Sequence, residues 1–513
     1  MMLEKQTDKI FMPFLRTACL GLVVVCLVSL AGCNKAKENV ERTDNEARKS
    51  ELENSESGSN IPKNKDSVTK DLAYLQTGID GAIPSAVQRA GDVSVGGQAL
   101  VTEPIVSCGL PLTLLKQLEV DAPFTLPNRK GEAASLPYNL NLIEDANGVQ
   151  LAASNCLTCH ATPLFGKLVI GLGNEFLDFT VNPSVAIERA GALVTGQHEI
   201  AAWEKFADRV ATIAPYIQTE TVGVNPANNL TYALMSHRDP KTMGWLDAPR
   251  IAPPPRHVPP VSVPPWWRMK KKHAMFSMGE GRGDHASFMM TAAILCTDSL
   301  QELKQLDKIA PDIRAYIASL EPPKYPFAID AALAQTGKTV FESTCSTCHG
   351  TYGEQSFYPN KLVDINVIGT DPSLIDFIFS DGSVFVDWFN ESPFGELAKA
   401  SPGRGYVAPP LDGIWSTAPF LHNGSVPTIR AVLDSASRPE IWQHQDRSSA
   451  SEASYNQGDL GWYFRGPTDT ADDWNNRWLY DTSKLGYANH GHQFGDGLSD
   501  AQRDAVIEYL KTL

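Results

Sequence analysis

Two short stretches of this chain carry the residue types and the spacing of a covalent cofactor site. Each reads Cys-x-x-Cys-His. Two thiols at this spacing can add to the two vinyl groups of one porphyrin, and the adjacent histidine then lies beneath the iron as its proximal ligand, so the motif predicts c-type haem. The predicted attachment residues are Cys156, Cys159 and His160 in the first motif and Cys345, Cys348 and His349 in the second. The alternative is a pair of Cys-x-x-Cys zinc sites.

The other cysteines have separate explanations. The chain has nine, of which Cys19 and Cys26 lie in an N-terminal export signal. Cys33 is the candidate for lipid attachment, which leaves Cys108 and Cys296. An exported protein meets an oxidising compartment, so we expect a disulfide between these two. Two separate buried thiols are the alternative.

Residues 1–33 are typical of an export signal rather than of folded structure. A positively charged start precedes an apolar run over 18–30, which is too short to span a bilayer as a mature helix. Leu-Ala-Gly-Cys then ends at Cys33 and resembles a bacterial lipobox. This implies a lipid-anchored protein of the bacterial cell envelope that faces the periplasm, and Asn34 in place of an aspartate favours the outer membrane. An ordinary signal peptide cleaved nearby is the alternative.

The rest of the chain divides into a tether and two predicted domains. Residues 34–70 have almost no large apolar side chains, so we expect a disordered tether. The remaining length suffices for an N-terminal haem c domain over 71–325 and a C-terminal cytochrome c domain over 326–513. The Glu-Pro-Pro sequence at 321–323 marks the boundary, because a helix cannot continue through it.

The formal net charge of -15 limits the partners of this protein. It argues against binding nucleic acid or an anionic lipid surface, because both would repel an acidic chain. It would suit a basic partner.

The predicted fold is mainly α, with two cytochrome c-like haem domains and long loop insertions. In the second domain, the helical spacing over 331–343 resembles the first helix of cytochrome c folds, which packs on a C-terminal helix. Ser499 with Gln502 gives a capping box for that last helix. The segment 435–490 has no clear periodicity and predicts a long surface loop region.

The first domain is less typical. An amphipathic helix is predicted over 199–217, and another over 298–320, which Pro311 must kink or split. The proline-rich stretch 251–267 between them predicts extended backbone that ends in two tryptophans.

Residues 416–428 carry a resemblance to a known superfamily. They read Ser-Thr-Ala-Pro-Phe-Leu-His-Asn-Gly-Ser-Val-Pro-Thr, which resembles the T-x-P-x-x-H-[ND]-G-[ST] signature of the bacterial dihaem cytochrome c peroxidase and MauG superfamily. Pro-Trp-Trp at 265–267, Lys-Lys-Lys-His at 270–273 and Gly-His-Gln-Phe-Gly at 491–495 look closest to the rubber oxygenase branch. The resemblance covers about residues 100 to 513, more closely in the second domain than in the first.

The resemblance implies a calcium ion between the domains, held partly by the backbone carbonyls of Thr417 and Pro419. Oxygen ligands of this kind suit calcium, and the alternative is that this turn is only scaffold. It also implies a tryptophan between the two irons as a route for electrons. Trp267 is the better candidate of the adjacent pair, with aromatic packing as the alternative.

The sixth ligand of the second haem decides what that iron can do. The superfamily has a methionine or a tyrosine after the His-Asn-Gly element, but this chain has no methionine after Met290 and neither residue type near Ala436. A histidine is therefore expected. Rubber oxygenase-like proteins carry a histidine ligand in a similar Gly-His-x-Phe-Gly element, which favours His492. The candidates are His422, His444, His490 and His492. His422 then fits a structural role near the haem edge.

The distal side of the first haem should come from the segment 265–290. In the rubber oxygenases the N-terminal haem is the open one, and Phe276 is the candidate for its distal wall. Arg282 and His285 could polarise a bound peroxide, or form a structural ion pair. The segment could also supply a sixth ligand, and Met289 and Met290 fit core packing at helical spacing. The side chains considered are His273, Met275, Phe276, Met278, Arg282, His285, Met289 and Met290.

Three functions follow from these readings. The first is a redox enzyme whose N-terminal haem reacts with peroxide or oxygen and whose C-terminal haem, held by two histidines, stores electrons. The second is a membrane-tethered electron-transfer cytochrome that exchanges electrons with a redox partner protein and carries out no substrate chemistry. The third, which the nearest branch implies, is dioxygenase cleavage of a polyisoprenoid or another unsaturated lipid.

Overall fold

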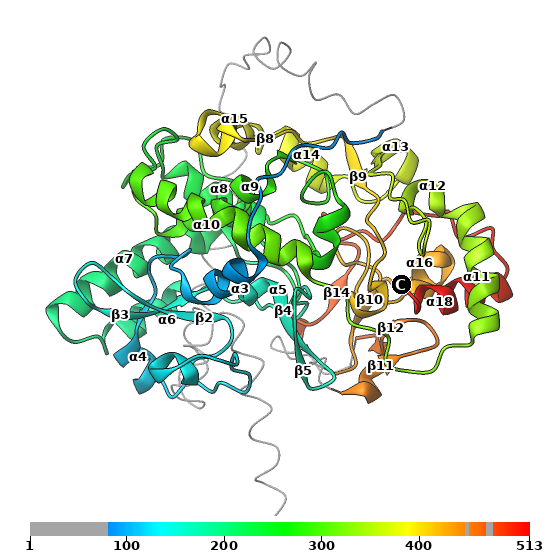
Figure 1. Ribbon diagram of the computed structural model, residues 1–513, viewed down its shortest axis with the longest axis horizontal. Coiled ribbons are helices and arrows are strands. Elements are labelled where there is room, and N and C mark those ends of the chain that lie inside the picture. The colour runs from blue at the N-terminus through cyan, green and yellow to red at the C-terminus, as the bar shows by residue number, and fades with distance from the viewer. Residues whose placement is uncertain (1–80, 447–450, 468–475) are drawn as a thin grey trace, which may run out of the picture.

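The computed structural model describes residues 81–446, 451–467 and 476–513. The predicted signal over 1–33, with Cys33, and the predicted tether over 34–70 lie outside these residues. Within the described ranges, no helix combines the length and the apolar character needed to cross a membrane. Figure 1 shows the N-terminal half of the chain beside the C-terminal half, with α11 and α18 at one end and α7 and α4 at the other.

Two crossing helices organise the C-terminal half. Helix α11 (Ala331–Thr344) begins at the N-cap Asp330, and α18 (Asp500–Leu510) begins at Ser499, whose capping box with Gln502 is present as predicted. Gly337 lies at the crossing, where an added Cβ would stand 1.8 Å from the carbonyl oxygen of Ala505. Only a glycine permits this approach. The short α12 (Ser346–His349) continues from α11 and carries the second haem motif.

A second helix pair organises the N-terminal half. Helix α3 (Val93–Thr102) packs on α10 (Leu300–Ser319), and Gly96 meets the carbonyl of Asp312 at the crossing. Helix α10 is continuous through the buried Pro311, which corrects the expected break. The packing against α3 on the same turn holds the helix where proline removes one internal hydrogen bond.

A small antiparallel sheet and a disulfide complete this half. The sheet has the order β1-β3-β2, formed by Leu110–Pro111, Gln150–Ser154 and Leu140–Glu144. Cys108 and Cys296 are joined in a disulfide with their Cα atoms 5.6 Å apart, in a core cluster with Trp203 and Phe206 of α7 (Gln197–Ile213). Hairpin β4-β5 (Ala161–Leu164 and Lys167–Ile170) follows the first haem motif.

The two halves share parts of their cores. Strand β6 (Gly281–Gly283) pairs with β8 (Ala398–Ala400), and α15 (Ser383–Glu391) packs beside α8 (Ala227–Ser236) in one apolar cluster. Trp388 on α15 donates its indole N–H to the carbonyl of Arg238 at 2.9 Å. The predicted boundary between two domains at residue 325 therefore stays a prediction, because the two halves do not have wholly separate cores.

The segment 435–490 is not the surface loop that we expected. Among its described residues, β10 (Ile441–His444) pairs with β13 (Phe464–Arg465) and β14 (Tyr480–Asp481), and β11 (Tyr455–Asn456) pairs with β12 (Gly461–Trp462). Most of its described aromatic side chains are buried, and Tyr463 is the exposed one among them. Strands of two to four residues are too short to produce a readable alternation in the sequence.

Shorter elements connect these units. Two of them, the strands β7 (Leu362–Asp364) and β9 (Gly405–Val407), pair with each other. The remaining elements are α4 (Leu112–Gln117), α5 (Leu157–His160), α6 (Ser184–Gly191), α9 (His285–Met289), β7 (Leu362–Asp364), α13 (Ile365–Ile368), α14 (Ser373–Phe379), β9 (Gly405–Val407) and α16 (Ile429–Leu433).

Candidate functional site

The second haem motif is presented by the end of α11. Cys345 is the C-cap of α11, and His349 ends α12 before Gly350, whose φ of +80° stops the helix. The Nδ1 atom of His349 lies 2.8 Å from the carbonyl oxygen of Pro409. A histidine that donates from Nδ1 to a carbonyl keeps Nε2 free for a metal. Burial lowers the pKa of His349, which favours the neutral imidazole that binds iron.

His492 stands across from His349. The two ring centres are 6.2 Å apart. Two ring nitrogens that each lie about 2 Å from one metal ion put the ring centres about 6 Å apart, so this gap matches one iron between them. Burial lowers the pKa of His492 to about 4, so its imidazole is also neutral. The residues fit a haem with a histidine on each face.

For the other three candidate histidines, the described contacts are with residues other than His349. The ring of His422 stacks on Tyr406 with 3.9 Å between centres. His444 faces Glu175, and the Nδ1 atom of His490 lies 2.7 Å from the carbonyl of Gly369. His422 is buried, and burial lowers its pKa to about 3, as expected for a structural residue rather than a charged one.

The first haem motif lies on the short helix α5. His160 ends this helix, and its ring stacks on Trp266 with 4.7 Å between centres and 22° between planes. The carbonyl of His160 accepts from the amide of Gly171, and the carbonyl of Gly171 accepts from the amide of Trp266, both at 2.8 Å. These bonds tie the predicted proximal ligand to the Pro-Trp-Trp element. Burial lowers the pKa of His160 to about 4.

Trp267 lies where the two halves meet. Its side chain is fully buried, and its indole N–H donates to the carbonyl of Asp412 at 2.8 Å. It shares an apolar cluster with Leu164 and Leu172, which follow the first motif, and with Trp415 from the other half. Trp267 therefore occupies a position between the two motifs, while its role in electron transfer stays a prediction.

Phe276 is held in an unusual backbone conformation. Its φ is +64°, in a turn where the amide of Met275 donates to the carbonyl of Gly281 at 2.9 Å. Its ring meets that of Phe288 edge-on at 5.3 Å, and Cys159 packs on the same apolar cluster. A left-handed phenylalanine costs roughly 1–3 kcal/mol and persists only where its surroundings hold it. The expected wall residue is thus in the apolar region beside the first motif.

Arg282 and His285 are both buried, and neither forms an ion pair with a carboxylate within the described part of the chain. Arg282 lies on β6, and His285 begins α9 with both ring nitrogens lacking a hydrogen-bond partner among the described residues. Burial lowers the pKa of His285 to about 4. Met290 is a buried member of the adjacent apolar core and Met289 packs against it, which agrees with the core interpretation.

Two charged side chains in the same segment were not predicted. Lys272 donates to the carbonyl of Phe276 at 3.3 Å. Burial raises the pKa of Glu280 to about 7 and lowers that of Lys272 to about 8, and each charge opposes the shift of the other. The sequence shows these residues only as parts of a mixed charged run, so only the tertiary structure reveals them as buried.

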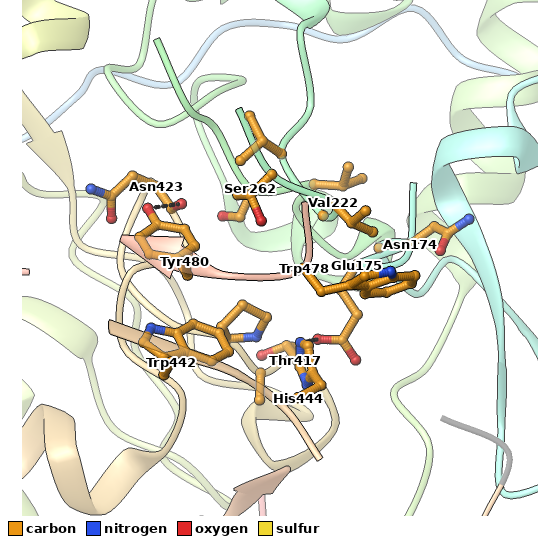
Figure 2. A pocket seen from close by; sticks show the side chains of 18 of the residues that line it. Asn174, Glu175, Val222, Ser262, Thr417, Asn423, Trp442, His444, Trp478 and Tyr480 are labelled. Carbon is orange, nitrogen blue, oxygen red and sulfur yellow. Dashed lines mark hydrogen bonds and ion pairs between the residues drawn. The ribbon is translucent and has the colours of Figure 1, made fainter. Parts of the chain in front are cut away.

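Thr417 and Pro419 line a cavity between the two halves. The space in it that water-sized groups can occupy is about 40 Å³. Figure 2 shows Glu175 and His444 facing each other there, with the Glu175 carboxylate and the His444 Nε2 at 3.9 Å. Burial raises the pKa of Glu175 well above its ordinary value and lowers that of His444 to about 4, so burial disfavours the charged form of each group. Trp478 lies beside Glu175 in Figure 2, and Trp442, which stacks on Tyr480, lies next to His444.

The cavity residues fit the calcium ion that the resemblance implies. One carboxylate oxygen of Glu175 is buried with no hydrogen-bond partner among the described residues, and Asn174 lines the same cavity. Carboxylate, amide and backbone oxygens are the ligands that calcium prefers. No short motif in the sequence marks Glu175, so its place beside Thr417 and Pro419 could not be predicted.

The zinc alternative finds no support in the described part of the chain. A zinc site needs three or four converging ligands, and within these residues no three side chains of the types that bind metal gather as a set. Burial raises the pKa of Cys156 to about 11 and that of Cys159 to about 12, which disfavours the thiolates that zinc requires.

Comparisons with known proteins agree with a cytochrome c. Residues 405–443, which include Thr417, Pro419 and His422, match a family model described as RoxA-like, cytochrome c-like. A cytochrome c-like domain implies covalently bound haem c.

The chain is similar to two uncharacterized proteins of Sinorhizobium fredii (strain NBRC 101917 / NGR234). Protein y4iM is 30% identical over 233 residues, which cover 38% of this chain and 52% of y4iM, and protein y4iJ is 28% identical over 310 residues, which cover 46% and 50%. The chain thus spans about half the length of these curated relatives.

Proposed function

We propose that this protein is a dihaem c-type oxidoreductase with one open and one closed haem site. The observation that carries the proposal is the difference between the two motifs. At the second motif, the ring of His492 lies 6.2 Å from that of His349. At the first motif, the ring contact of His160 is with Trp266, and the aromatic cluster of Phe276 lies beside Cys159.

Each group of residues then has a distinct task. Haem, when bound, supplies iron that exchanges electrons and can react with peroxide or oxygen. His349 and His492 would hold the second haem between them and would exclude other ligands from its iron. His160 holds the first haem from one side, and Phe276 and Phe288 keep its other side apolar. Trp267 lies between the two sites as the route for electrons.

The decisive experiment is the optical spectrum of the dithionite-reduced protein before and after carbon monoxide. Carbon monoxide binds only where a ferrous haem has an open or readily vacated position. We expect about half of the haem to shift, with peroxide and oxygen as the next reactants to test. A shift of neither haem would contradict the proposal. Replacing His492 with glycine is the matched control, because it should make the second haem reactive as well.

One observation favours a second candidate function, an electron-transfer cytochrome without substrate chemistry. His285 is buried, and both of its ring nitrogens lack a hydrogen-bond partner among the described residues. A neutral buried imidazole of this kind could serve as the sixth ligand of the first haem. In that case wild-type protein would not bind carbon monoxide, whereas a His285→Ala variant would bind one equivalent.

The partners and the location are further parts of the proposal. Support for a calcium ion comes from Thr417, Pro419 and the unpartnered oxygen of Glu175. A redox partner protein, or peroxide or oxygen as a small oxidant, would supply or remove electrons. Cys33 would anchor the chain by lipid in the cell envelope, on the periplasmic side of the outer membrane.

A further inference from the structure

The loop that carries His492 has a backbone that needs external support. Gly491 and His492 are both left-handed, with φ of +74° and +47°. For a histidine this costs roughly 1–2 kcal/mol relative to ordinary conformations. Two contacts with the end of α13 support this backbone. The amide of His492 donates to the carbonyl of Ile368 at 2.7 Å, and His490 contacts the carbonyl of Gly369.

The guanidinium group of Arg438 supplies most of the remaining hydrogen bonds to residues 489–492, which we call the ligand loop. Arg438 donates to three carbonyls of the ligand loop, at 2.6 Å for Asn489, 2.7 Å for Gly491 and 3.2 Å for His492. The same group donates to two carbonyls at the end of α16, at 2.9 Å for Ala431 and 3.3 Å for Val432. The planar fork of an arginine can make several such bonds at once, which a lysine cannot.

This arrangement joins the ligand loop to the end of α16, beside a bond from the side-chain amide of Asn489 to the carbonyl of Pro439 at 2.8 Å. Helix α16 lies in the core of the C-terminal half, where Ile429 and Ala431 are buried. The ligand loop is half-exposed, and Phe494 beside it is 47% exposed. A charged donor bonds more strongly than a neutral one. Arg438 therefore holds the loop at the surface in a fixed position relative to the buried helix α16.

We infer that Arg438 is a positioning residue that holds His492 in place as the sixth ligand of the second haem. The inference rests on the proposed function, because it assumes that His492 is that ligand. Without the guanidinium, three loop carbonyls lose their donor, and the left-handed backbone at His492 can relax. The ring would then leave its place opposite His349 for part of the time, and the iron would accept other ligands.

The chain offers a matched control for this arginine. Arg503 is also largely buried, with a side chain 11% exposed, and it donates to the carbonyl of Leu433 at the same end of α16. Its other carbonyl partner is that of Asp496, at 3.0 Å. It makes no described bond to residues 489–492 of the ligand loop. Removal of Arg503 should therefore disturb the same helix end without freeing His492.

The experiment compares Arg438→Met, Arg503→Met and His492→Gly in the haem-loaded protein. Carbon monoxide bound per chain is counted after reduction. We expect Arg438→Met and His492→Gly each to bind one equivalent more than the wild type, and Arg503→Met to equal the wild type. If His492→Gly gains an equivalent and Arg438→Met does not, the inference about Arg438 is wrong. If His492→Gly itself gains nothing, the proposed ligand is wrong.

Hydrogen exchange of the loop amides provides a second test that needs no gas ligand. Arg438→Met should exchange faster than wild type at residues 489–494, while α18 keeps its protection. Arg438→Lys should lie between the two, because an ammonium group retains some of the donors. Unchanged exchange in the loop of Arg438→Met would overturn the inference even if this variant binds haem poorly.

Discussion

The crossing of α11 and α18 makes a strong prediction for Gly337→Ala. The added Cβ would stand 1.8 Å from the carbonyl oxygen of Ala505 and 3.0 Å from the Cβ of Tyr509. A Cβ is essentially never found within 3.0 Å of a nonbonded heavy atom from another part of the chain. The two helices must therefore move apart by roughly 1 Å, because neither backbone can bend out of the way within a regular helix.

The size of the effect follows from two opposing contributions. Overpacking of this kind costs about 1–3 kcal/mol, and a backbone-to-backbone clash lies at the upper end. Alanine is a better helix former than glycine by about 1 kcal/mol in a helix interior. We therefore expect Gly337→Ala to lower the free energy of unfolding by about 2 kcal/mol. Part of this loss is the separation of Phe341 from Tyr509, whose ring centres lie 5.3 Å apart.

The assay is denaturant unfolding of the haem-loaded protein, followed by tryptophan fluorescence and by the haem absorption band. Gly497→Ala is the control, because an added Cβ there meets nothing within 4 Å and the backbone of Gly497 is not left-handed. That variant should be unchanged or more stable by about 0.5 kcal/mol. A Gly337→Ala midpoint equal to that of the wild type would refute the reasoning about the helix crossing.

Two further predictions concern the sites. Trp267→Phe removes the hydrogen bond to the carbonyl of Asp412 and the indole itself, so we expect slower electron equilibration between the two haems in stopped-flow reduction, with both haems still attached. Unchanged kinetics would exclude Trp267 as the route. Glu175→Gln removes the buried carboxylate beside Thr417, so we expect calcium to raise the melting temperature of this variant, after chelator treatment, by less than it raises that of the wild type. An equal rise in both proteins would show that this carboxylate is not a calcium ligand.

The sequence predicts best where a short stretch determines its own structure. The helix ahead of the second motif and the capping box at Ser499 were predicted because helix propensity and caps act over a few residues. The continuity of α10 through Pro311 was not predicted. A proline inside a helix is locally unfavourable. The packing of α3, which lies far from α10 in the sequence, outweighs that cost.

The predicted haem-attachment residues of the candidate site could be read from the sequence. The residues that hold the site in place could not. The pattern of the two motifs names the predicted haem-binding cysteines and histidines without any fold. Arg438 and Glu175 carry no such pattern, because their partners are carbonyls and cavity walls that come from distant parts of the chain. The aromatic residues of 435–490 were read as surface for the same reason: strands of two to four residues show their burial only when they are paired.

The difference between the two haem motifs must therefore lie outside the motifs. Both have the same five-residue pattern, and both place a half-buried histidine with a lowered pKa at the end of a one-turn helix. What stands nearby differs: His492 lies across from His349, whereas Phe276 is held beside the first motif by its own strained turn. A left-handed residue occurs in both of these segments, and each is stabilised by hydrogen bonds from neighbouring residues. Under the proposed function, the chemistry of each haem is set by a short irregular segment that the surrounding helices and strands hold in place.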